Sequence, residues 1–153
     1  MDNSRSKNIK HLYSRAGFGI HYPELERLKK QKLNKVIDGL FKASAKVQDL
    51  DLVEKDREKK SYKELSAEEK KERQRQAREN TRSLNIAFLE RLSGSQAALR
   101  EKMTLFWHGH FACRTPQNPF ALQELNNVQR KHALGNFKTL TVEVSKTPAM
   151  LAF

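Results

Sequence analysis

The chain has 153 residues, of which 37% are hydrophobic and 31% are charged, and its formal net charge is +12. This length suffices for one domain with a hydrophobic core, and the single cysteine, Cys113, excludes an internal disulfide. No apolar run approaches the ~18 residues of a membrane-spanning helix, and residues 1–8 lack the apolar region of a secretory signal. The positive charge is spread along the chain, which does not favour a nucleic-acid partner.

Residues 1–43 are expected to form a group of short helices. Apolar residues at helical spacing predict a first helix that ends at Gly17, namely Ile9, Leu12, Tyr13 and Ala16. Pro23 suits the first position of a second helix, and Asn34 suits the N-cap of a third. The second helix would carry Leu25 and Leu28. The third would carry Val36, Ile37, Leu40 and Phe41.

A long, highly charged helix is expected to begin after Ser66 and to end near Leu92. Ser66 and Glu69 have the spacing of a capping box, in which each side chain accepts a hydrogen bond from the other residue's backbone N–H. Within residues 68–83 the only apolar residue is Ala77, so the first turns would lie in solvent as an arm. The apolar residues that follow are expected to enter the core.

Four more helix starts are predicted after the break at residues 93–95. The residues expected to cap or open these helices are Ser95, Asn118 with Pro119, Asn136, and Thr147 with Pro148. A helix start so close to Phe153 indicates a larger helical domain that has been truncated. The sequence thus predicts an all-α, irregular multi-helix domain, organised as residues 1–43, a polar, solvated linker at 44–65 and a helical region at 66–153.

Residues 99–111 concentrate the aromatic and histidine side chains. On a helical wheel of ~100° per residue, the apolar stripe contains Leu99, Met103, Phe106, Trp107 and His110. His108 falls on the opposite side with Glu101. We therefore expect the stripe to lie in the core and Trp107 to need an acceptor for its indole N–H. Glu101 would orient His108 from the same face.

Metal binding by these histidines is the less favoured interpretation. His108 and His110 could share an ion only if the backbone were extended at Gly109, because on a helix they face different directions. His110, His132 and a carboxylate such as Glu124 or Glu101 form a second arrangement. In a simple antiparallel hairpin, however, the two histidines would lie ~20 Å apart. Both could instead stabilise helix C-termini as cations, so we expect no cofactor and keep a divalent metal as the alternative.

Four blocks of the sequence carry a family resemblance: residues 11–19 (HLYSRAGFG), 99–112 (LREKMTLFWHGHFA), 129–137 (QRKHALGNF) and 145–151 (SKTPAML). In this order they resemble the bacterial family catalogued as domain of unknown function 1800. The resemblance implies a mostly helical fold, of which this chain is the N-terminal part. It also implies frequent export by bacteria, and a protein partner from a sulfatase-like family that is commonly encoded beside these proteins.

Several residues are candidates for function because they lie in these blocks. The candidates for catalysis are His108, Glu101, His110 and His132, and the candidates for metal binding are His108 and His110. The other motif positions are His11, Arg15, Trp107 and Asn136. Arg15 is expected to tie the turn after the first helix to a carboxylate or a helix end. Cys113 has no assigned base and is expected to be inert.

Three functions follow from these observations. The first is a helical module of an exported bacterial protein that binds or assembles with a partner. The alternative is the N-terminal part of a hydrolytic or metal-assisted enzyme, whose site would join the Trp-His-Gly-His segment to residues beyond Phe153. The third is a weak binder of nucleic acid or of an anionic surface.

Overall fold

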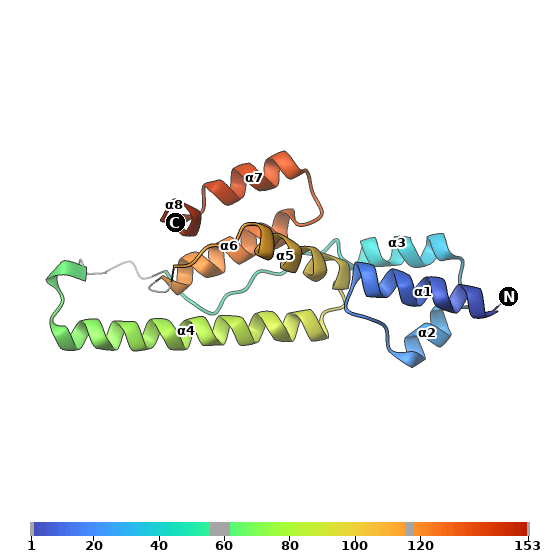
Figure 1. Ribbon diagram of the computed structural model, residues 1–153, viewed down its shortest axis with the longest axis horizontal. Coiled ribbons are helices and arrows are strands. Elements are labelled where there is room, and N and C mark those ends of the chain that lie inside the picture. The colour runs from blue at the N-terminus through green and yellow to red at the C-terminus, as the bar shows by residue number, and fades with distance from the viewer. Residues whose placement is uncertain (1, 56–61, 116–117, 153) are drawn as a thin grey trace.

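A computed structural model describes residues 2–55, 62–115 and 118–152 (Figure 1), so residues 56–61 of the predicted linker lie outside it. Within these ranges the chain forms eight α-helices, one short 3-10 helix and no strand, which confirms the all-α fold class. The elements are α1 (Asp2–Ala16), α2 (Tyr22–Leu28), α3 (Leu33–Ala43), η1 (Tyr62–Glu64), α4 (Ala67–Gly94), α5 (Ala98–His110), α6 (Pro119–His132), α7 (Phe137–Ser145) and α8 (Pro148–Leu151). None of the described helices is both long and apolar enough to cross a membrane.

Helices α5 and α6 form the centre of the molecule, with the long helix α4 on one side and α7 on the other (Figure 1). Buried apolar residues form two clusters. One joins α6, α7 and α8 through Ala121, Leu125, Leu140, Val144 and Ala149. The other joins α1, α2 and α3 through Ile9, Leu25, Leu28 and Val36. Helix α5 connects the two groups, because it contacts α1 and α3 as well as α6.

The N-terminal helices follow the sequence prediction except at the start of α3. Pro23 lies in the first turn of α2, which buries Leu25 and Leu28 as expected. Helix α3 begins at Leu33 and Lys32 is its N-cap, so the prediction that Asn34 caps this helix was wrong. Leu33 packs against the N-terminal apolar cluster, and this contact extends the helix beyond the residue with the best capping side chain.

Gly17 is needed for close packing rather than for an unusual backbone angle. The only described residue with positive φ is Gly19, at 110°. A Cβ at residue 17 would lie 3.2 Å from both Ala98 Cβ and Tyr13 O. We therefore expect Gly17→Ala to lower the free energy of unfolding by about 1–3 kcal/mol, because the end of α1 would be forced away from α5.

Gly39, in the middle of α3, provides the matched control. A Cβ there would meet no atom within 4 Å. Gly39→Ala should raise the free energy of unfolding by about 0.5–1 kcal/mol, because alanine loses less backbone entropy in a helix. Urea titration of both variants measures the two changes, and a stabilising Gly17→Ala would contradict the close contact.

Helix α4 begins with the predicted capping box. Ser66 Oγ accepts a hydrogen bond from Glu69 N at 3.2 Å, and Glu69 Oε2 accepts one from Ser66 N at 2.7 Å. Leu84 is buried as expected, but the prediction that the whole apolar end enters the core was wrong for Ile86 and Leu89, which are 47% and 61% exposed. Ile86 lies ~200° around the helix from Leu84 and therefore points away from α6.

Caps made by asparagine are confirmed in the C-terminal half. Asn118 Oδ1 accepts from Ala121 N at 3.1 Å, with Pro119 opening α6, and Asn136 Oδ1 accepts from Thr139 N at 3.2 Å. Thr147 occupies the N-cap position of α8, but its hydroxyl donates to Val144 O at 2.7 Å and makes no capping hydrogen bond. Ser95 was wrong as the N-cap of α5, since that position belongs to Ala97. Helix α5 is positioned instead by long-range polar contacts of Arg100 and Glu101.

Residues 44–55 are held against α6, although most of their side chains are exposed as their composition predicted. The Gln123 side chain pairs with the backbone of Val53, donating to its O at 2.9 Å and accepting from its N at 3.0 Å. Asn127 pairs with the backbone of Leu50 in the same way, at 2.8 Å in each direction. Leu50 and Val53 are buried. The amide side chains of α6 satisfy the backbone N–H and C=O groups of these two residues, as the backbone of a neighbouring strand would in a sheet.

Candidate functional site

Helix α5 buries its charged face and exposes much of its aromatic face. Arg100, Glu101 and Thr104 are 7%, 4% and 0% exposed, whereas Phe106 is 57% exposed and His110 also lies in solvent. The prediction that Phe106 and His110 belong to the core was therefore wrong. The wheel correctly separated the two faces of the helix, but apolar content alone assigned the wrong one to the interior.

A buried ion pair explains why the charged face can lie inside. Arg130 of α6 donates through Nε to both carboxylate oxygens of Glu101, at 3.1 and 3.2 Å, and through Nη2 to Oε2 at 3.2 Å. Its Nη1 donates to Asn126 Oδ1 at 2.6 Å, and Phe88 lies 5.7 Å from the guanidinium carbon. Arg130 is fully buried, so its charge is stable there only because these partners satisfy it.

Arg100 forms the second half of this network. Its Nε donates to Ser44 O at 2.7 Å, and its Nη1 donates to the carbonyl oxygens of Arg130 and Lys131 at 2.6 and 3.2 Å. The latter two carbonyls lie at the C-terminal end of α6, where a cation is favourable. Arg100 thus joins the end of α3, the start of α5 and the end of α6. We call Arg100, Glu101, Asn126 and Arg130 the buried arginine network.

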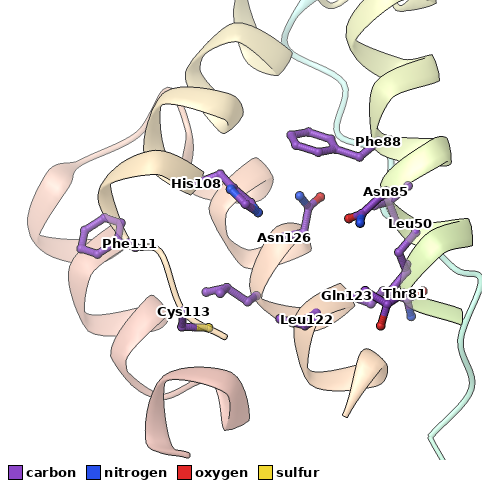
Figure 2. Close-up of a pocket in the computed structure, with 12 residues that line it drawn as sticks. Leu50, Thr81, Asn85, Phe88, His108, Phe111, Cys113, Leu122, Gln123 and Asn126 are labelled. Atoms are coloured by element: carbon purple, nitrogen blue, oxygen red, sulfur yellow. The ribbon is translucent and has the colours of Figure 1, made fainter. Parts of the chain in front are cut away.

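His108 faces a small cavity between α4, α5 and α6 (Figure 2). The volume of this His108 cavity is about 70 Å³. It is lined by Leu50, Thr81, Leu84, Asn85, Phe88, His108, Phe111, Cys113, Leu122, Gln123, Leu125 and Asn126. Glu101 lies on the same face of α5 as His108. Its carboxylate accepts hydrogen bonds from Arg130, however, and not from His108, which the sequence had suggested it would orient.

His108 stays more than one-third exposed, but desolvation of the part of its ring that lies against the cavity walls lowers its pKa below the usual 6.5. The Phe88 ring, 5.8 Å away between centroids, is one of these walls. At neutral pH the imidazole is therefore uncharged, with one nitrogen able to donate a hydrogen bond and the other able to accept one. Burial likewise raises the pKa of the Cys113 thiol, which disfavours the reactive thiolate.

The lowered pKa of His108 has a consequence for stability. Below its usual pKa of 6.5, the unfolded chain binds a proton at His108 more readily than the folded chain does. The folded state should therefore lose stability as the pH falls below about 6.5. At higher pH, His108 should not change the free energy of unfolding. His108→Gln should make the free energy of unfolding depend less steeply on pH between about pH 7 and 5. Urea titration at each pH measures this free energy. An unchanged slope would contradict the lowered pKa.

An aromatic surface lies on the other side of α5. We define it as Phe106, Trp107, His110 and Phe137. Trp107 is half-buried and central, with ring-centroid distances of 4.8 Å to Phe106, 6.0 Å to His110 and 5.6 Å to Phe137. Its Nε1 donates to Ala133 O at 3.0 Å, which confirms the expected need for an acceptor. This hydrogen bond fixes the indole ring against α6.

The remaining predicted residues lie apart from the His108 cavity. His11 and Arg15 are exposed on α1, His132 lies in the last turn of α6, and Asn136 caps α7. Within the described ranges, no three His, Cys, Asp or Glu side chains are grouped as metal ligands would be. Of the four candidates for catalysis, only His108 lines the cavity. Glu101 belongs to the buried arginine network instead.

Residues that the sequence did not single out are central to this region. Asn126 and Arg130 of α6 and Phe88 of α4 join the cavity to the buried ion pair. Arg130 lies in the block at residues 129–137, which was a usable signal. Its partner could not be read from the sequence, because Glu101 is 29 residues away.

These features define the class of protein. It is an all-α domain with two buried arginines and a small cavity lined in part by His108. Residues 11–153 match the family described as "Protein of unknown function (DUF1800)". The chain belongs to this family. Neither the curated proteins nor the solved structures compared with the chain include a match.

Proposed function

We propose that the chain is a helical module that binds a partner protein through the aromatic surface. The observation that carries the proposal is the exposure of Phe106 and Phe137, at 57% and 56%, on either side of an anchored Trp107. Exposed aromatic side chains that lie together are typical of binding surfaces, and tryptophan is enriched among the residues that dominate binding energy. The fixed indole ring would lose little conformational entropy on binding.

The charge of the chain indicates the chemistry of this partner. The net charge is +12, and exposed Lys131 and Lys138 are close in sequence to residues that contact the aromatic surface. A partner with an acidic contact region would be attracted by this charge and its association would slow at high salt. The sulfatase-like protein suggested by the family resemblance is the first partner to test.

Titration calorimetry of the chain with that sulfatase-like protein tests the proposal. The double variant Phe106→Ala/Phe137→Ala should weaken binding at least ~30-fold, the effect of losing about 2 kcal/mol at the centre of an interface. Leu89→Ala is the matched control, because Leu89 is 61% exposed on α4, outside the aromatic surface. Absence of binding by the unaltered chain, or equal weakening in the control, would contradict the proposal.

The hydrolytic alternative is supported by fewer observations. A neutral His108 beside a cavity is suited to general-base catalysis. The carboxylate expected to orient it, Glu101, is instead bound by Arg130. We therefore rank binding of a protein partner first.

A further inference from the structure

We infer that the His108 cavity is a binding site for a small uncharged amide group, such as the end of an Asn or Gln side chain or a free carboxamide. This site is separate from the aromatic surface and does not depend on the proposed partner. A cavity of about 70 Å³ has room for a group of only a few heavy atoms, since ~10–15 Å³ of cavity volume suffices for one water molecule. The occupant must therefore be recognised by few contacts.

Some polar groups of the cavity walls are already paired. The Gln123 amide is bound to the backbone of residues 52 and 53, and Thr81 Oγ1 donates to Ala77 O at 2.8 Å. Asn126 uses only its oxygen, which accepts from Arg130. Its Nδ2 makes no hydrogen bond with the described residues, although Asn126 is only 7% exposed. The Nδ2 atom is not fully enclosed, so water or a ligand in the cavity can supply its acceptor.

The unpaired groups converge from three helices. Figure 2 shows the amides of Asn85, from α4, and Asn126, from α6, lying toward the ring of His108, from α5. Asn126 supplies a donor that is polarised by the charge of Arg130 behind it. Asn85 and a neutral His108 can each supply one donor and one acceptor. An amide matches this set, because it carries an acceptor oxygen and a donor nitrogen on one small plane.

Charge on the cavity walls favours an uncharged occupant. Arg130 is neutralised by Glu101 and reaches the cavity only through Asn126, while the raised pKa of Cys113 keeps its thiol protonated. No side chain that lines the cavity carries a full charge at neutral pH. A carboxylate or an ammonium group would therefore lose its hydration without gaining a counter-charge. Phe88 and Phe111 supply apolar walls that can cover the carbon atoms of the ligand.

Titration with acetamide, followed by NMR of the side-chain amide and histidine signals, tests this site. Saturable shifts at Asn126 and His108 are expected, with acetate binding at least ~10-fold more weakly because it lacks the donor and carries a charge. His108→Ala should weaken acetamide binding about tenfold, the value of one to two lost hydrogen bonds. His11→Ala, which changes an exposed histidine on α1 outside both the cavity and the aromatic surface, should have no effect.

A second variant addresses the donor directly. Asn126→Asp can still accept from Arg130 but cannot donate into the cavity, so acetamide binding should again fall about tenfold. If this variant does not fold, His108→Ala remains the test, because the His108 side chain makes no hydrogen bond with the described residues. Comparison of acetamide with a short peptide bearing a Gln side chain distinguishes a free from a peptide-borne amide. Acetate binding as tightly as acetamide, or acetamide binding unchanged in His108→Ala, would overturn the assignment.

Discussion

Glu101→Ala is expected to lower the free energy of unfolding by about 3–5 kcal/mol, the cost of leaving a buried charge without its partner. Glu101 is 4% exposed and its carboxylate accepts three hydrogen bonds from the fully buried Arg130. Without it, the guanidinium would keep Asn126 Oδ1 but would lose its only counter-charge among the described contacts. Urea denaturation followed by circular dichroism measures the loss.

The control for this prediction is an ion pair on the surface of the long helix. Glu72 accepts from Arg75 at 2.7 Å, but both side chains are more than half exposed. Glu72→Ala should leave the urea midpoint almost unchanged, because water screens the pair. If Glu101→Ala were no more destabilising than Glu72→Ala, the buried arginine network would not be present in solution.

Trp107→Ala is expected to lower the free energy of unfolding by about 3 kcal/mol, at the lower end of the range for removing a large aromatic side chain. The ring is half-buried, contacts Phe111 at 5.9 Å between centroids and packs against the C-terminal apolar cluster. Its indole N–H holds Ala133 O at the end of α6. Thermal unfolding followed by circular dichroism gives the change in midpoint.

Two variants separate the contributions at this position. Trp107→Phe keeps most of the ring contacts but loses the hydrogen bond to Ala133 O. Loss of this bond should lower the free energy of unfolding by about 1 kcal/mol, in addition to the effect of the smaller buried apolar area. Phe106→Ala should cost less than Trp107→Ala, because Phe106 is 57% exposed. Equal losses for Phe106→Ala and Trp107→Ala would mean that the aromatic surface is buried in solution.

The starts of α2, α4, α6, α7 and α8 could be predicted from the sequence because their causes are local, whereas the caps predicted for α3 and α5 were wrong. The capping box at Ser66, the Asn118 and Asn136 caps and the prolines in the first turns each act within one turn of helix. The orientation of α5 could not be predicted in this way. It is set by Arg130 and by the carbonyl of Ser44, which lie far away in the sequence.

The same reason limits what could be predicted of the candidate site. His108 was correctly placed on the polar face of its helix, apart from Trp107. The cavity that it faces is built by Asn85, Phe88 and Asn126, which belong to two other helices and have no recognisable spacing relative to it. From composition alone a polar residue such as Asn126 is expected in solvent, and the contacts of α6 with the neighbouring helices bury it, whereas Asn85 stays exposed.

Both proposed sites depend on α5 turning its charged face inward and its aromatic face outward. The most direct measurement is the rate of thiol labelling at single cysteines placed on the two faces, in a Cys113→Ser background. Phe106→Cys should react rapidly under native conditions, whereas Thr104→Cys, at a position 0% exposed, should react only through unfolding. Rapid labelling at position 104 together with protection at position 106 would contradict this orientation, and with it both binding sites.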